Sequence, residues 1–163
     1  MAKPLVAIVM GSASDWEIMQ QTAHALQEFG VEFDARVISA HRSPDLLFEY
    51  IKEMSEKGVQ CFIAGAGGAA HLAGVIAGKT ILPVLGVPIP SKYLKGMDSL
   101  LSIVQMPKGI PVATFAIGEA GAANAGLFAV AMLATNDKVL AQKLTHYRKK
   151  QADQIAATTL PAL

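Results

Sequence analysis

The chain has 163 residues, of which 52% are hydrophobic and 17% are charged, against a charged share of roughly 25% in an average soluble domain. A formal net charge of +1 argues against nucleic-acid binding and against attachment to anionic membranes by charge. The single cysteine, Cys61, excludes an internal disulfide and a metal cluster built on cysteines. Because Cys61 lies in an apolar segment, we expect a buried, unreactive thiol.

The length predicts one domain over residues 1–163. The low charged share indicates that contacts with other copies of the chain bury part of its surface. A parallel sheet covered by helices would also be apolar on both faces, so the two interpretations are compatible. The sequence has neither a secretory signal peptide nor a run of 18 apolar residues, so we expect a cytoplasmic protein.

Short apolar segments alternate with helix-like segments along the whole chain. Strands are expected at residues 6–10, 31–38, 59–64, 81–86 and 112–116. Helices are expected at residues 15–29, 44–57, 69–78, 97–105, 119–134 and 137–155. This alternation predicts an α/β fold, a flavodoxin-like three-layer α/β/α sandwich with a central five-stranded parallel sheet in the order 2-1-3-4-5. The extra C-terminal helix follows the last strand unit, so it either packs on a neighbouring subunit or frays.

Several helix ends carry recognisable boundary residues. The expected N-caps are Ser14, Ser43 and Asp137 or its neighbour Asn136. Gly30 and Gly58 are expected to end their helices.

Polar, glycine- or serine-rich segments follow the first three strands. In a parallel sheet of this order their carboxyl ends meet at one crevice, so we expect these segments to form one site. After the first strand, Gly11 allows a sharp turn, and Ser12 and Ser14 offer hydroxyls at a new helix N-terminus, where phosphate binds well. Asp15 suits ribose hydroxyls better than a phosphate. Ordinary helix capping by Ser14 and Asp15 is the alternative.

After the second strand comes Ser39-Ala-His-Arg42. Arginine is a permanent cation with several donors for a phosphate, and an imidazole transfers protons near neutral pH. His41 and Arg42 together therefore predict a phosphorylated substrate with proton-transfer chemistry beside it, although a lone histidine is more often structural.

After the third strand, Gly65, Gly67 and Gly68 indicate close approach of the backbone to a ligand or to another chain. The segment matches the dinucleotide fingerprint weakly, but it follows the wrong strand and lacks the later acidic residue, so we do not expect NAD. His71 either lines the site or caps the next helix.

Other signatures of chemistry are missing from the sequence. We find no nucleotide-binding P-loop, no nucleophile elbow and no His-Glu-x-x-His zinc motif. We therefore expect a reaction that uses neither a metal nor a cofactor.

At these segments the chain resembles a known enzyme family. The motifs are Met-Gly-Ser-Ala-Ser-Asp-Trp at 10–16, Ser-Ala-His-Arg-Ser-Pro at 39–44, Gly-Ala-Gly-Gly-Ala-Ala-His-Leu at 65–72, Pro-Val-Leu-Gly-Val-Pro at 83–88 and Asp-Ser-Leu-Leu-Ser-Ile-Val-Gln-Met-Pro at 98–107. They resemble the bacterial N5-carboxyaminoimidazole ribonucleotide mutases of purine biosynthesis. The resemblance implies a flavodoxin-like subunit of a homo-octamer. It also implies a reaction that moves a carboxylate from the exocyclic nitrogen of an aminoimidazole ribonucleotide to its ring carbon 4, without a cofactor.

The resemblance also implies a role for each matching residue. His41 would be the general acid and base. Ser12, Ser39 and Arg42 would hold the 5′-phosphate, and Asp15 the ribose hydroxyls. The remaining substrate contacts would come from Ser14, Ala66, Gly67, His71 and Leu72. One departure is Ala73, where the family usually has proline, which could loosen the loop over the carboxylate.

Three alternatives stay open. The first is the related carboxylase, which takes free carbon dioxide and which physical reasoning does not separate from the mutase. The second is a non-catalytic module that binds flavin mononucleotide or receives a phosphoryl group, although the loops offer only Trp16 for stacking and only Asp15 as an acid. The third, a purely structural oligomer, leaves His41 and Arg42 without a role.

Overall fold

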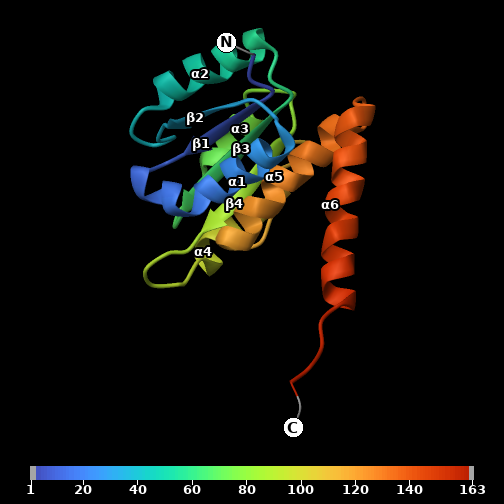
Figure 1. Cartoon of the computed structure of the whole chain (residues 1–163). Helices are drawn as coiled ribbons and strands as arrows, with labels where there is room; N and C mark the ends of the chain where they lie inside the picture. The colour runs from blue at the N-terminus through green and yellow to red at the C-terminus, as the bar shows by residue number, and fades with distance from the viewer. Residues whose placement is uncertain (1–2, 162–163) are drawn as a thin grey trace.

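The computed structural model describes residues 3–161 as a parallel sheet between two layers of helices (Figure 1). The strands are β1 (Val6–Met10), β2 (Phe33–Val37), β3 (Cys61–Gly67), β4 (Val84–Ile89) and β5 (Ala113–Thr114). All pair in parallel in the order β2-β1-β3-β4-β5, which confirms the predicted flavodoxin-like topology.

The two faces of the sheet carry separate hydrophobic cores. Helices α1 (Trp16–Phe29) and α5 (Glu119–Ala134) cover one face, where they bury Ile8 of β1. Helices α2 (Pro44–Lys57), α3 (Leu72–Ala77) and α4 (Met97–Val104) supply the other core, which contains the next residue of the strand, Val9. Adjacent strand residues point to opposite faces, so a strand buried on both sides is apolar throughout, as β1 is.

Helices α1 and α5 pack closely, because small residues line their contact. A Cβ atom added to Gly126 would lie 2.9 Å from the backbone oxygen of Thr22. The buried hydroxyl of Thr22 donates to the carbonyl of Ala122 at 2.7 Å and joins the two helices.

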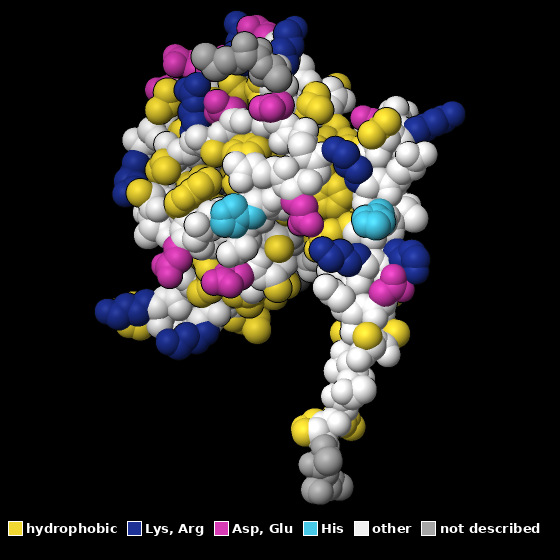
Figure 2. All heavy atoms as spheres, viewed as in Figure 1, with side chains coloured by type: hydrophobic (Ala, Val, Ile, Leu, Met, Phe, Trp, Pro, Cys, Tyr) yellow, Lys and Arg dark blue, Asp and Glu magenta, His cyan; other side chains and the backbone are white. Residues whose placement is uncertain are grey.

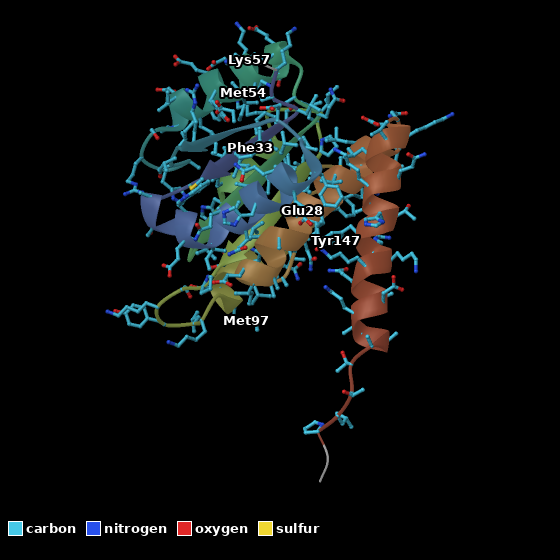
Figure 3. All side chains as sticks on the ribbon, viewed as in Figure 1. Glu28, Phe33, Met54, Lys57, Met97 and Tyr147 are labelled. Atoms are coloured by element: carbon cyan, nitrogen blue, oxygen red, sulfur yellow. The ribbon has the colours of Figure 1, made fainter. Side chains whose placement is uncertain are left out.

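Helix α6 (Lys138–Ala156) begins against α5 and then extends away from the body of the molecule (Figures 1 and 2). Asp137 caps it through bonds from the N–H groups of Val139 and Leu140, as predicted. Tyr147 projects toward α1, where its ring lies 5.4 Å from that of Phe29 (Figure 3). Among residues 3–161, no helix is long and apolar enough to cross a membrane.

Two strands lie further along the chain than predicted. We expected the fourth strand at 81–86, but β4 is Val84–Ile89 and so includes Pro88. The carbonyl of Pro88 accepts from the N–H of Gly118 at 2.9 Å, so the N–H side of this residue faces away from β3. Proline is tolerated there because β5 is only two residues long and pairs with Leu85 and Gly86, not with Pro88. We expected the third strand to end at Ala64, but β3 continues to Gly67 because β4 extends far enough to pair with it.

One N-cap prediction was wrong. Ser12, not Ser14, caps the first turn, a 3-10 helix (η1, Ala13–Asp15) that precedes α1. Ser43 occupies the N-cap position of α2 as predicted, but its hydroxyl makes no capping bond and donates instead to the carbonyl of Ser39 at 3.0 Å. The glycine stops are confirmed: Gly30 and Gly58 adopt the left-handed conformation, with φ of 72° and 90°.

Candidate active site

The carboxyl ends of the central strands lie side by side, as the strand order requires. Met10 at the end of β1 pairs with Val37 of β2 and Gly65 of β3, and Gly67 pairs with Ile89 of β4. These strand ends and the loops that follow them line an open cavity of about 460 Å³. Its lining comprises Gly11, Ser12, Asp15, Ser39, Ala40, His41, Arg42, Ala66, Gly67, Gly68, Ala69, His71, Leu72, Ile89, Pro90 and Ser91.

The turn after β1 is held by two reciprocal hydrogen bonds. The N–H of Ser12 donates to Oδ2 of Asp15 at 3.1 Å, and the Ser12 hydroxyl accepts from the N–H of Ser14 at 3.4 Å. Ser14 itself does not line the cavity, although its hydroxyl lies 3.0 Å from that of Ser12. The turn therefore presents Ser12 and Asp15 to the cavity, with Ser14 supporting Ser12 from outside.

Asp15 is a carboxyl group with little exposure to water. Burial raises its pKa above the usual 3.8, while hydrogen bonds from the backbone of Ser12 and Gly11 and the charge of Arg42 act in the opposite direction. A ligand hydroxyl bound to this carboxylate would replace part of the hydration that burial removes.

Arg42 connects the loops that follow β1 and β2. Its Nη2 donates to the carbonyl of Gly11 at 2.9 Å, and its Nε donates to the hydroxyl of Ser39 at 3.3 Å. The backbone N–H of Arg42 also donates to the Ser39 hydroxyl, at 3.2 Å. The guanidinium is exposed and thus available to an anion in the cavity.

The two histidines of the cavity are in direct contact. Nε2 of His41, from the loop after β2, lies 2.8 Å from Nδ1 of His71, from the loop after β3. Their rings are nearly perpendicular, at 88°. His71 precedes α3 without making a capping hydrogen bond, so of the two predicted roles the structure gives it the place in the cavity.

The glycine segment forms a wall of the cavity. Ala66 and Gly67 are the last residues of β3 rather than loop residues as expected, and Leu72 begins α3. Gly68 turns the chain with φ of 69°, a conformation that favours glycine. Its N–H donates to the buried hydroxyl of Ser99, on α4, at 2.9 Å.

Sequence reasoning missed the contribution of the end of β4 and of the loop after it. Ile89, Pro90 and Ser91 line the cavity but were not predicted to, because the fourth strand was expected to end three residues too early. Gly11, Ala40 and Ala69 were also missed as lining residues, although they lie within the motifs already recognised, whereas Gly68 was expected to approach a ligand or another chain and does line the cavity. Across residues 3–161, no group of three or more His, Cys, Asp and Glu side chains is arranged to hold a metal ion.

Comparison with known proteins identifies relatives of this fold and site. The family model described as AIR carboxylase matches residues 5–154. The N5-carboxyaminoimidazole ribonucleotide mutase of Escherichia coli (strain K12) is 58% identical over 150 residues, which are 92% of this chain and 89% of that protein. The mutase of the same name from Bacillus subtilis (strain 168) is 57% identical over 147 residues, 90% of this chain and 91% of that protein.

The fold also matches that of a solved protein structure. The crystal structure of Treponema denticola PurE superimposes with a TM-score of 0.86 at 30% identity, and the match covers 94% of each chain. Because the family model covers most of the sequence and close relatives match almost end to end, the chain belongs to the AIR carboxylase family.

Proposed function

We propose that this chain is a mutase that converts N5-carboxyaminoimidazole ribonucleotide into its 4-carboxy isomer, a step of purine biosynthesis. The observation that carries the proposal is that His41 and Arg42 line one cavity, in a chain whose relatives bear that name. The cavity combines an anion site with an imidazole, which a phosphorylated substrate that must gain and lose a proton requires.

The phosphate of the substrate binds Ser12, Ser39 and Arg42. The guanidinium supplies several donors to a phosphate, and Ser39 already holds it in place. Asp15 accepts hydrogen bonds from the ribose hydroxyls, and Ser14 acts through its contact with Ser12.

The reaction needs one proton donor that later becomes the acceptor. His41 as imidazolium protonates the exocyclic nitrogen while the bond between that nitrogen and the carboxylate carbon breaks. This step yields carbon dioxide and the free aminoimidazole. The π electrons of the bond between carbons 4 and 5, which the free amino group enriches, then form the bond from carbon 4 to the carbon dioxide. The neutral His41 removes the proton from carbon 4, which restores the aromatic ring and the imidazolium. General acid–base catalysis of this kind contributes about 10²–10⁴-fold, and holding carbon dioxide beside carbon 4 contributes through proximity.

The carbon dioxide is held by the wall opposite the phosphate. Ala66, Gly67 and Leu72 offer small or apolar surfaces there, and His71 offers a polar atom beside His41. Ala73, where the family usually has proline, directly follows Leu72 of this wall. Ala73 is buried as the second residue of α3, a position where proline is tolerated because the N–H has no partner within the helix.

The subunit acts in a closed homo-oligomer, for which an octamer is our proposal, and in the cytoplasm. Helix α6 buries only Leu140 within the subunit, and Ile155 near its end is 77% exposed. Phe128 of α5 is 47% exposed and faces a groove beside α6. Packing of α6 and this groove against neighbouring copies would bury these side chains.

The test is to supply the two possible substrates separately. The mutase proposal expects turnover of N5-carboxyaminoimidazole ribonucleotide and little turnover of aminoimidazole ribonucleotide with bicarbonate. Turnover of the second pair alone would instead establish the carboxylase alternative. Absence of turnover with both, in a folded protein, would reject the proposal in favour of a ligand-binding module. Native mass spectrometry of the same sample tests the octamer.

A further inference from the structure

Helix α4 has no assigned role in the proposed reaction, although it lies directly behind the cavity. Its residue Ser99 is completely buried. The Ser99 hydroxyl accepts a hydrogen bond from the N–H of Gly68 at 2.9 Å and donates one to the carbonyl of Ile89 at 2.7 Å. A serine hydroxyl has a single proton to donate, so this donor is fully used and fixed in direction.

The two partners of Ser99 belong to different walls of the cavity. Gly68 follows β3, Ile89 ends β4, and both line the cavity. Gly67 and Ile89 form the last registered pair between these strands. Beyond that pair no sheet pairing joins the segment after β3 to β4. The Ser99 hydroxyl connects these two segments instead, through Gly68 and Ile89.

The hydrogen bond to Ser99 restricts the backbone conformation of Gly68. The φ of Gly68 is 69°, but glycine adopts positive and negative φ values about equally well, so its own conformational preference does not hold the turn. The bond from Gly68 to Ser99 fixes the orientation of the peptide that precedes the turn. On the other side of the turn, the carbonyl of Gly68 accepts from the N–H of Ala70 at 2.8 Å, and the Ser102 hydroxyl lies 3.3 Å away.

We propose that Ser99 is a positioning residue for carboxylate transfer. It holds the Gly68 turn against the end of β4, and so keeps the cavity wall closed around the carbon dioxide between its release and its capture. This inference rests on the proposed function. Ser99 does not line the cavity, so it acts on the reaction only through Gly68 and Ile89.

Three variants of the full chain test the proposal. Ser99→Ala removes both hydrogen bonds. Ser99→Cys fills the same space but is a weak donor and a weak acceptor. Thr22→Val is the matched control, because it removes another buried hydroxyl that donates to a backbone carbonyl at 2.7 Å, between α1 and α5 and outside the cavity lining.

The first readout is hydrogen–deuterium exchange of the peptide that covers residues 65–71, without substrate. We expect exchange at the Gly68 amide to rise about tenfold in Ser99→Ala, in line with the loss of one net hydrogen bond, and to stay unchanged in Thr22→Val. Unchanged exchange in Ser99→Ala would overturn the proposal. This readout does not depend on what the protein catalyses, so it separates failure of the inference from failure of the proposed function.

The second readout is the amount of aminoimidazole ribonucleotide released per 4-carboxy product formed, corrected for spontaneous loss of carbon dioxide. We expect this ratio to rise about tenfold in Ser99→Ala, to rise less in Ser99→Cys, and to match the unmodified protein in Thr22→Val. A loss of fold stability alone lowers the amount of active protein and leaves the ratio unchanged. An unchanged ratio in Ser99→Ala, with product still formed, would overturn the role in retaining carbon dioxide.

Discussion

Nε2 of His41 lies 2.8 Å from Nδ1 of His71, so the two imidazoles of the cavity form one hydrogen-bonded pair. A bond between these nitrogens needs one of them to carry a proton and the other to be free. The contact therefore orients the ring of His41 and allows His71 to determine which of its nitrogens bears hydrogen. Within the proposed reaction, the two histidines act together rather than as independent groups.

Replacement of His41 tests its role as acid and base. We expect His41→Asn to keep its fold and assembly but to lose turnover by about 10²–10⁴-fold, the usual contribution of a general acid–base residue. His24→Asn is the matched control, because His24 lies exposed on α1 and does not line the cavity. Steady-state rates and circular dichroism of both variants provide the measurement. A fully active His41→Asn protein would contradict the mechanism.

Asp15 is expected to bind substrate at a cost in stability. Its carboxyl pKa is raised by burial, so the folded chain holds more protons than the unfolded chain between pH 3.8 and the raised value. The free energy of unfolding therefore falls as the pH rises through this window, and the loss persists at neutral pH. We expect Asp15→Asn, which keeps an oxygen to accept from Ser12, to unfold at a higher temperature than the original near neutral pH.

The same variant is expected to bind substrate less well, with KM raised at least about tenfold through loss of charged hydrogen bonds to the ribose. Thermal unfolding of both proteins across the acidic range checks the link between the pKa of Asp15 and stability, since the difference between their unfolding temperatures shrinks as the pH falls. An Asp15→Asn protein that is less stable at neutral pH would show that burial of the charge is not the dominant effect.

Gly86 of β4 is required by close packing against α4. A Cβ at this position would lie 2.5 Å from Cγ2 of the buried Ile103. We expect Gly86→Ala to destabilise the fold by about 1–3 kcal/mol, as overpacking of a core does. In Gly67→Ala, the control in the neighbouring strand, the new Cβ would find its nearest atoms at an ordinary 3.5 Å. Denaturant unfolding measures the free energy of unfolding of both variants, and equal values for Gly86→Ala and Gly67→Ala would refute this packing argument.

Cys61 is expected to be unreactive in the folded protein. It is 1% exposed, and burial raises the pKa of its thiol to about 12. The thiolate is the reactive form, so iodoacetamide should leave the native protein unmodified at mildly alkaline pH and modify it fully in denaturant. Mass spectrometry distinguishes the two, and rapid modification of the native chain would show that β3 opens readily.

Elements with strong boundaries could be predicted from the sequence. Helix α2 begins at Pro44 and ends before Gly58, and β1 is a continuous apolar run that is buried on both faces. The position of β4 could not be predicted as well, because an apolar segment from 81 to 89 allows several registers, and the choice depends on its pairing with β3.

The site could be predicted wherever it lies in loops that follow strands. Ser12, Asp15, Ser39, His41 and Arg42 line one cavity because the strand order brings their loops together. The contact between His41 and His71 joins residues 30 positions apart and depends on side-chain direction, which no local pattern encodes. Ser99 was missed for a similar reason, since a serine in an amphipathic helix is normally solvated rather than bonded to the turn after one strand and the end of another.

The most direct test of the central claim follows the carboxylate itself. Substrate labelled with ¹³C at the N5-carboxylate is converted in buffer that contains excess unlabelled bicarbonate, and the label in the 4-carboxy product is measured by mass spectrometry. If carbon dioxide stays in the cavity between release and capture, the product keeps the label of the substrate. Product that instead carries the unlabelled carbon of the buffer would contradict intramolecular transfer and identify the protein as a carboxylase.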